Sequence, residues 1–526
     1  MKTNNRVLIS AAVSAGLICL LVYLRTLGFD FVRMDDTDYV IENQYIRNLD
    51  RDFFQWAFTT APFDLWMPLT WLSFAVDYHF WMLNPSGFHL TNIVLHAANA
   101  GLVVLIADRV LKMAWSEEEG ECRYFATLLL AGLLWGIHPL RVESVAWVAE
   151  RKDVLNGVFT LGSVLAYLCY TEKNTEKARA WPSYLLSLFL FVCSLMAKPV
   201  SVVIPFMLLV MDWFPLQRLN RNNVCQLVVE KLPFLVFSVA AALMTFKFGA
   251  ENRLLISAEN LPFLYRIVIA GNALLEYYRL MLVPVGILPL FVLPNPIPYS
   301  YAFKAFAAFA VTVAFLVYWR KQQAVAATWL LFVLPMILVS GLLQNGMQAL
   351  AARYTYLSAV PVSIATAALA ACILKSVPVR HLHLLRCLLP VTLFCLLLFY
   401  GVMTWRLTGV WKDTASYWSR VIDLAPESYP LARLARGRFY YDTGRLDEAI
   451  RDLTVIIEAE KGEGIPKADN VIALRGEIHA KMGRNQEALA DYDYAISVYP
   501  DPAYLTSRAK LLEKLGRATE TKNESR

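Results

Sequence analysis

Long apolar segments separated by short polar connections dominate the chain. A helix needs about 20 apolar residues to cross a bilayer, and eleven segments approach that length. They lie near residues 7–27, 90–107, 124–137, 154–170, 183–197, 199–214, 232–249, 301–319, 325–343, 356–375 and 388–405. The pattern predicts an all-α, polytopic helical membrane protein with about eleven transmembrane helices. Because Lys2 and Arg6 precede the first segment and no small-residue cleavage site follows it, we expect an uncleaved anchor.

Positively charged side chains predict the orientation, because Lys and Arg are enriched in short cytoplasmic connections. With eleven crossings, the following residues all fall on one side: Lys2, Arg6, Arg109, Lys112, Arg123, Lys173, Lys177, Arg179, Arg218, Arg221, Arg320, Lys321, Lys375, Arg380 and Arg386. The N-terminus is then cytoplasmic, and the acidic loop 28–88 lies outside.

One apolar segment, 261–290, does not fit this count. A crossing there would move Arg320 and Lys321 to the outer side. We therefore expect it to be re-entrant or interfacial. Its prolines should break the helix and leave irregular backbone lining a cavity; they are Pro284, Pro289, Pro294, Pro296 and Pro298.

Composition supports the membrane class and limits the chemistry. Hydrophobic residues make up 57% of the 526 positions and charged residues 17%. The eight cysteines occur in apolar runs or in connections predicted to be cytoplasmic, and no CxxC pair is present. We therefore expect neither a disulfide framework nor a cysteine metal site. The net charge of +6 gives no support for nucleic-acid binding.

The segment MDDTDYV, residues 34–40, follows directly after the first apolar run. Its three carboxylates, Asp35, Asp36 and Asp38, are costly beside a membrane unless they face water or cations. They are candidates for acid–base chemistry at the outer surface, and a solvated acidic loop is the alternative. No cofactor is firmly predicted, although these carboxylates could hold a divalent cation.

A second charged stretch covers residues 137–153, in a connection predicted to lie outside. A basic cluster there opposes the topological trend. Either an anionic ligand such as a lipid phosphate stabilises it, or its acids and bases pair internally. Its charged or titratable members are His138, Arg141, Glu143, Glu150, Arg151, Lys152 and Asp153.

Two further cations are expected at outer ends of crossings. Arg353 precedes the tenth crossing beside Tyr354 and Tyr356, where a guanidinium can grip a phosphate while the aromatic rings anchor the interface or stack on a sugar. Lys198 lies in a tight outer turn and can be interpreted in the same way. Simple snorkelling is the alternative for Arg353.

Polar residues form a stripe along the second crossing. His89, Asn92, His96 and Asn99 recur at spacings of three and four, so they share one helix face. This face should point into the protein and hydrogen bond across helices. Metal binding is less favoured because no carboxylate shares it.

After Trp405 the sequence becomes charged and repetitive, which predicts a boundary between a membrane domain, 1–405, and a soluble domain, 406–526. The repeat resembles the tetratricopeptide pattern of about 34 residues. Its period of 39 points to an insertion around 461–469. The domain should lie outside and dock on the membrane domain or on a partner such as the acceptor protein, or act only as a cap or spacer. The repeated small residues are Gly437, Gly444 and Ala449, then Gly476, Gly483 and Ala488, then Ala509 and Gly516.

Taken together, these motifs resemble bacterial membrane proteins with tetratricopeptide tails that are related to the transmembrane and tetratricopeptide O-mannosyltransferases. That family belongs to the GT-C glycosyltransferases, which use polyprenyl-phosphate sugars. The resemblance covers nearly the whole chain and rests on FDFVRMDDTDYVIENQYI, PLTWLSFAVDY, LNPSGFHLTNIVLHAANA, HPLRVESVAWVAERKDVLNG, LMAKP, QALAARYTYLS and the repeats.

The resemblance implies a GT-C-like enzyme of a bacterial inner membrane that transfers a hexose, such as mannose, from a polyprenyl-phosphate donor to an extracytoplasmic acceptor, such as a protein hydroxyl. It implies that Asp36, with Asp35, is catalytic on the acceptor side. The residues implied at the donor phosphate are Arg353, Lys198, Arg151, Lys152 and His138. Those implied on the acceptor or sugar side are Asp38, Glu143, Tyr354, Tyr356 and His89.

Three positions depart from the related chains: Met67 and Phe74 replace histidines, and Ala352 replaces an acid. These changes could mean another sugar, another acceptor or reduced activity. Two other classes stay open: a transporter of lipid-linked sugars and a scaffold that recruits partners through its repeats. A transporter needs no acid pair beside the first crossing, and a scaffold needs no charged cluster at 138–153.

Overall fold

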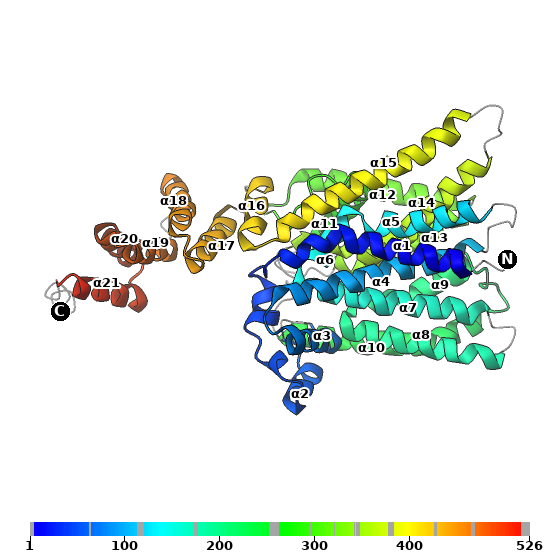
Figure 1. The fold of residues 1–526 in the computed structure, drawn as a ribbon, viewed down its shortest axis with the longest axis horizontal. Coiled ribbons are helices and arrows are strands. Elements are labelled where there is room, and N and C mark those ends of the chain that lie inside the picture. The colour runs from blue at the N-terminus through cyan, green and yellow to red at the C-terminus, as the bar shows by residue number, and fades with distance from the viewer. Residues whose placement is uncertain are drawn as a thin grey trace. The chain divides into compact units, whose positions relative to one another are not determined.

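The computed structural model divides the chain into two compact units, Met1–Lys412 and Asp413–Arg526 (Figure 1). It describes residues 5–62, 65–112, 120–172, 177–251, 262–294, 296–319, 321–340, 342, 348–376, 383–425, 429–463 and 469–516. Four of the predicted cytoplasmic cations, Lys2, Lys173, Arg320 and Arg380, lie outside these ranges.

The first unit is a bundle of long helices, as the apolar pattern predicts. Every predicted crossing coincides with a helix. The helices are α1 (Asn5–Tyr23), α4 (Pro85–Lys112), α5 (Glu121–Gly136), α7 (Arg151–Glu172), α8 (Lys177–Ala197), α9 (Ile204–Trp213), α10 (Val224–Glu251), α11 (Phe263–Leu282), α12 (Tyr299–Trp319), α13 (Gln323–Val339), α14 (Thr355–Ser376) and α15 (His383–Thr408).

Their lengths make this an all-α polytopic membrane protein. Among the described residues, eight helices are long and apolar enough to cross a bilayer. A ninth candidate is α5 together with Pro139–Ala146, which are bent by 52° at the break between them. Two further predicted crossings, in Pro199–Trp213 and α13, form apolar helices shorter than the usual span.

The segment 261–290 forms one helix, α11, followed by extended chain. The helix runs unbroken to Leu282 and packs along α12. The prolines do not interrupt it, because all five follow its last residue. The predicted irregular backbone is therefore confirmed, but after the helix rather than within it. A re-entrant or interfacial position for α11 stays a prediction.

Short elements gather at the end of the bundle where α1 ends and α4 begins. They include η1 (Leu24–Gly28), η2 (Thr37–Ile41), α2 (Arg51–Thr59) and α3 (Pro68–Trp81) from the first loop, and η6 (Pro139–Arg141), α6 (Val142–Ala146) and η7 (Val148–Glu150) from the second charged stretch. In the described part, a two-stranded antiparallel ribbon, β1 (Phe291–Val292) with β2 (Gln348–Leu350), pairs Phe291 with Leu350. This ribbon brings the chain after α11 next to the start of α14.

The polar stripe on α4 faces the protein interior, as predicted. His89, Asn92, His96 and Asn99 are all buried. The two nitrogens of His96 lie 2.8 Å from the Tyr356 hydroxyl and from the Gly136 carbonyl oxygen. These hydrogen bonds tie α4 to α14 and α5, so the stripe connects helices in the way that polar groups do inside membrane bundles.

The second unit consists of helical hairpins. Its helices are α16 (Thr414–Leu424), α17 (Tyr429–Asp442), α18 (Leu446–Glu463), α19 (Asp469–Lys481), α20 (Asn485–Val498) and α21 (Pro502–Lys514). Gly444 and Gly483 have φ of +77° and +78° in equivalent turns, a conformation that favours glycine. An added Cβ on Gly437 or Gly476 would contact the partner helix. These small residues therefore allow paired helices to approach closely.

An arginine contact recurs in the second unit with the same 39-residue period. Arg436 donates to Asp452 and to Ser419. Arg475 donates to Asp491 and Thr454 in the same pattern one unit later. Each guanidinium thus connects three successive helices. The assignment of these hairpins to the tetratricopeptide class stays a prediction, and most of the predicted insertion, 464–468, lies outside the described residues.

Candidate functional site

Asp36 lies at the start of η2 and connects the first loop to the second charged stretch. Its Oδ2 accepts the backbone N–H of Val32 at 2.8 Å, and its Oδ1 accepts that of Ala149 at 2.7 Å. The side chain is 1% exposed. Burial raises the pKa of this carboxyl to about 7, although the two backbone hydrogen bonds act in the opposite direction. Near neutral pH, Asp36 can therefore either hold or release a proton.

Lys152, near the start of α7, joins the acidic loop to Glu150 at the end of η7. Its ammonium lies 3.8 Å from the Asp35 carboxylate and 3.1 Å from Glu150. The same ammonium lies 4.9 Å from the centre of the Tyr39 ring. Asp35 and Asp36 are thus neighbours with different surroundings. Asp35 is partly exposed and lies near the buried Lys152 ammonium, whereas Asp36 is buried and accepts two backbone N–H groups.

Glu150 is the hub of the charged network. It is 1% exposed. Besides Lys152, its carboxylate lies 3.5 Å from the Lys198 ammonium and 3.2 Å from Nε of Arg353. Three cations from three parts of the chain therefore converge on one carboxylate, which explains how a charged group can be buried at this position.

Lys198 and Arg353 face a hollow, which we call the lysine hollow, with about 360 Å³ of empty space, open solvent included. Lys198 donates to Asp153 at 2.5 Å, and Arg353 donates to Gln348 at 2.6 Å and to Glu143. Their side chains remain 12% and 11% exposed. The hollow is lined by Asp153, Asn156, Lys198, Val200, Pro335, Val339, Arg353, Tyr354, Tyr356 and Leu357.

These two cations keep unused hydrogen-bond donors. A guanidinium has five N–H donors and an ammonium three. Within the described contacts, Arg353 commits its side chain to Glu143, Glu150 and Gln348, and Lys198 contacts Asp153 and Glu150. The N–H donors that are left can donate to an anion such as a phosphate in the lysine hollow.

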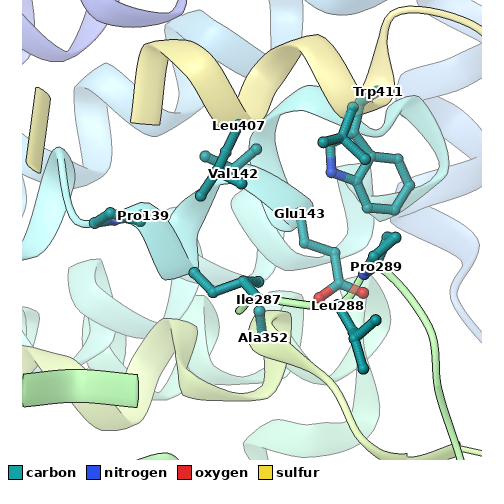
Figure 2. Close-up of a pocket in the computed structure, with 10 residues that line it drawn as sticks. Pro139, Val142, Glu143, Ile287, Leu288, Pro289, Ala352, Leu407 and Trp411 are labelled. Carbon is teal, nitrogen blue, oxygen red and sulfur yellow. The ribbon is translucent and has the colours of Figure 1, made fainter. Parts of the chain in front are cut away.

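A second hollow, which we call the tryptophan hollow, is lined by Ala352, the residue before Arg353 (Figure 2). It has about 300 Å³ of empty space, open solvent included, and mostly apolar walls. Figure 2 shows the Glu143 side chain directed toward the chain that carries Leu288 and Pro289. This is the irregular backbone that the prolines predict. The lining residues are Pro139, Val142, Glu143, Ile287, Leu288, Pro289, Ala352, Leu407, Val410 and Trp411.

The second charged stretch was predicted either to bind an anionic ligand or to pair its acids and bases internally, and these contacts support both alternatives. The internal ion pairs are present, because Glu143 and Glu150 contact Arg353, Lys152 and Lys198. The cations that face the lysine hollow also retain capacity for an anion. The network brings together seven of the predicted site residues: Asp35, Asp36, Lys152, Lys198, Arg353, Glu143 and Tyr354.

Arg151 lies apart from this network, and its predicted place at a donor phosphate stays a prediction. It is fully buried. Its guanidinium pairs with Asp77 at 2.6 Å and donates to Phe88 O at 2.8 Å and to Asn92. The cation is thus neutralised inside the bundle, and it lines neither hollow.

His138 is also held away from both hollows. Its Nδ1 accepts the Leu140 N–H, and its Nε2 lies 3.2 Å from Met281 O. The imidazole packs against Tyr400 with ring centres 4.6 Å apart. Its two nitrogens thus contact the backbone of Leu140 and of Met281, and its predicted role at a donor phosphate stays a prediction.

Three predicted acceptor-side residues have other surroundings. His89 is buried against Phe29, with ring centres 6.2 Å apart. The Tyr356 hydroxyl accepts from Asn99 at 2.9 Å, although the residue also lines the lysine hollow. Asp38 is exposed on the first loop. Of these three, only Tyr356 reaches a hollow among the described residues.

The carboxylates of the first loop do not converge on a metal-binding point. Among the described residues, no group of three or more His, Cys, Asp or Glu is arranged to hold a metal ion. Asp35 faces Lys152 while Asp36 accepts two backbone N–H groups. The hypothesis of a divalent cation at this loop therefore gains no support from the geometry.

The sequence reasoning missed Trp147 as a member of the site. Its ring stacks on Trp411, with centres 5.0 Å apart and planes at 20°. Lys152 and Arg353 lie 5.8 and 5.7 Å from its ring centre. A tryptophan between two charged groups in the second stretch was the available signal, because cations favour indole faces.

The three positions that depart from related chains lie in packed surroundings. Met67 and Phe74 are fully buried, and the Arg151 guanidinium lies 5.2 Å from the Phe74 ring centre. Ala352 lines the tryptophan hollow. The first two departures therefore supply core packing, whereas the third shapes the wall of a hollow.

The fold and site thus define a helical membrane protein with a buried network of acids and cations between two hollows at one end of its bundle. No family model matches the chain, and no solved structure matches it. Curated relatives do share part of its sequence.

These relatives carry the name protein O-mannosyl-transferase. The chain is 30% identical to tmtc2 of Xenopus laevis over 229 residues, which is 42% of this chain and 26% of that protein. It is 27% identical to TMTC4 of Homo sapiens over 42% of this chain and 31% of the relative. For Tmtc1 of Drosophila melanogaster the identity is 29%, over 40% and 23%. The matches cover about a quarter to a third of these relatives, and they support the predicted relation to this family.

Proposed function

We propose that this protein is a membrane glycosyltransferase of the GT-C type. It transfers a hexose, such as mannose, from a polyprenyl-phosphate donor to a hydroxyl group of an extracytoplasmic protein. The observation that carries the proposal is the single network in which Asp35, the neighbour of Asp36, meets the cations of the lysine hollow through Lys152 and Glu150. The similarity to proteins named O-mannosyl-transferase supports the same class.

In the proposed reaction, the donor phosphate occupies the lysine hollow. Lys198 and Arg353 neutralise it, and they stabilise the charge that develops as the bond between the anomeric carbon and the phosphate oxygen breaks. The departing group is the lipid phosphate. Tyr354 lies beside the sugar. The centre of its ring is 5.0 Å from the Arg353 guanidinium carbon.

Asp36 acts as the general base on the other side of the reacting carbon. Its ionised carboxylate accepts the proton of the acceptor hydroxyl while the hydroxyl oxygen bonds to the anomeric carbon. A pKa of about 7 leaves a substantial ionised fraction at neutral pH and keeps the base strong enough to take the proton. Lys152 holds Asp35 beside it.

The proposal extends to the location of the protein. The N-terminus lies in the cytoplasm of a bacterial cell, the charged network faces the outside of the inner membrane, and the repeats of the second unit bind the acceptor. The distribution of Lys and Arg supports this orientation.

Sugar transfer in membranes tests the function. Membranes carrying the unchanged chain receive a radiolabelled polyprenyl-phosphate hexose, with mannose first, and labelled protein is counted. We expect Asp36→Asn to lower transfer at least a hundredfold, because an amide cannot accept the proton. Asp52→Asn, an exposed acid on α2 of the same loop, is the matched control and should retain full activity.

The result also separates the other functional classes. Equal transfer by the Asp36→Asn and unchanged chains would remove Asp36 from the mechanism. Absence of transfer by the unchanged chain with several donors and native membrane proteins would favour the scaffold instead.

A further inference from the structure

The two hollows share one ion pair. Arg353 lines the lysine hollow, Glu143 lines the tryptophan hollow, and the Arg353 guanidinium donates to the Glu143 carboxylate. Glu143 is 4% exposed. Whatever engages Arg353 from one side therefore alters the surroundings of Glu143 on the other.

Glu143 depends on Arg353 for its hydrogen bonds. Its Oε1 accepts from the guanidinium and its Oε2 accepts the backbone N–H of Arg353 at 2.9 Å. No other described residue donates to this carboxylate. A buried carboxylate that loses its cation needs another donor, because an unpaired charge in an apolar surrounding is strongly unfavourable.

A phosphate in the lysine hollow competes for the same guanidinium. Phosphate and carboxylate groups both accept paired N–H bonds from arginine, and the phosphate would gain the Lys198 ammonium as well. Glu143 would then keep the backbone N–H of Arg353 and lose the charged partner of Oε1.

We propose that Glu143 and the tryptophan hollow form the subsite for the acceptor polypeptide. An apolar side chain next to the glycosylated residue enters between Leu407, Ile287 and Trp411. A backbone N–H of the acceptor then donates to Glu143 in place of Arg353, once the donor phosphate has engaged that guanidinium. This inference rests on the proposed function and adds a specificity-determining residue and an order of binding to it.

The chemistry of the walls favours a peptide over the hydrocarbon tail of the donor. The hollow combines apolar side chains with one carboxylate. A peptide offers both an apolar side chain and N–H donors, whereas a polyprenyl chain would bury the carboxylate without a donor. Because coupling between two sites is reciprocal, each ligand should raise the affinity for the other.

Binding of two non-reacting probes to the purified full chain in nanodiscs tests the proposal. The first is a C20 polyprenyl phosphate that carries no sugar. The second is a fluorescent peptide, Ala-Leu-Thr-Leu-Ala, compared with Ala-Asp-Thr-Asp-Ala. We expect the polyprenyl phosphate to raise the affinity for the leucine peptide at least tenfold and to have little effect on the aspartate peptide.

Glu143→Gln should have opposite effects on the two probes. Removing the competing carboxylate should strengthen polyprenyl-phosphate binding, while the coupling to the leucine peptide should be lost. A merely structural role for Glu143 would weaken both. Leu407→Trp, which fills the hollow, should block the peptide and spare the lipid phosphate. Leu398→Trp, at an exposed position on the same helix, is its control.

Three results would overturn the subsite. They are equal peptide affinity with and without polyprenyl phosphate, no peptide binding to the unchanged chain in its presence, and loss of polyprenyl-phosphate binding in Leu407→Trp, which would assign the hollow to the lipid tail. The probes carry no sugar, so the outcome is separable from the proposed function. Coupling without sugar transfer would refute only the transferase, and transfer without coupling would refute only the subsite.

Discussion

Asp36 combines burial with hydrogen bonds that favour its ionised form. Burial acts more strongly and raises the pKa to about 7. Because the pKa is raised on folding, the contribution of Asp36 to the free energy of unfolding decreases as pH rises. The folded-state pKa lies above the value of 3.8 for a free side chain, so the stability that this carboxyl contributes is complete below that value and is lost as pH rises through about 7.

The proposed role of Asp36 predicts the opposite trend for activity. Only the ionised carboxylate can accept a proton, so transfer should rise by about tenfold between pH 6 and pH 8 and then level off. Initial rates of hexose transfer measured across this range check the prediction. Asp52→Asn should show the same profile, and a flat profile of the unchanged chain between pH 6 and pH 8 would assign the base to another group.

Residue types and their positions in the sequence indicated some of the site residues, but not which of these residues contact one another. The membrane pattern made Asp36, Lys198 and Arg353 conspicuous, because each is charged at the end of an apolar run. Arg151 and Lys152 are adjacent in the same pattern, yet one pairs with Asp77 inside the bundle and the other joins the network. Their separation depends on the turn at the start of α7, which periodicity does not specify.

At the scale of helices, the apolar pattern predicted which segments are helical better than it predicted how long each helix is or where it is interrupted. All eleven predicted crossings contain a helix because a polytopic chain must satisfy its backbone hydrogen bonds within each segment. The prolines near α11 were expected to interrupt it, but a proline after Leu282 can end a helix as well as break one. The β1 and β2 pairing joins segments far apart in the chain and had no local signal.

Close approach between α11 and α12 gives a prediction for a single glycine. A Cβ on Gly271 would lie 2.5 Å from the Ala305 Cβ and 2.7 Å from its Cα, so the backbone of α12 would have to move. We expect Gly271→Ala to destabilise the protein by about 1–3 kcal/mol. The measurement is the midpoint temperature of thermal denaturation. It is obtained by heating the detergent-solubilised chain and measuring the fraction that remains monodisperse.

The matched control for this glycine is Gly101 on α4. Its added Cβ would lie 3.6 Å from Ala12 O, an ordinary contact. Gly101→Ala should leave the midpoint nearly unchanged. If Gly271→Ala behaved in the same way, α11 and α12 would not pack as closely as their backbones indicate.

At the scale of the whole membrane unit, the two ends of the helical bundle differ in the charged contacts that they hold. At one end, Arg109 of α4 pairs with Glu172 of α7, and Arg123 of α5 donates to Leu374 O of α14 at 3.2 Å. The other end holds the buried network around Glu150. Because short cytoplasmic connections carry the excess of Lys and Arg, the first of these ends should face the cytoplasm.

Labelling single cysteines in intact spheroplasts tests this orientation. Native Cys122 is exposed at the start of α5, near Arg123. Asp52→Cys places a thiol on α2 in the acidic loop, and serine replaces the remaining cysteines in both variants. A membrane-impermeant maleimide should label Asp52→Cys in intact spheroplasts and Cys122 only after the membrane is opened. Reversed labelling would place Asp36 and both hollows on the cytoplasmic side, where an extracytoplasmic protein could not serve as the acceptor.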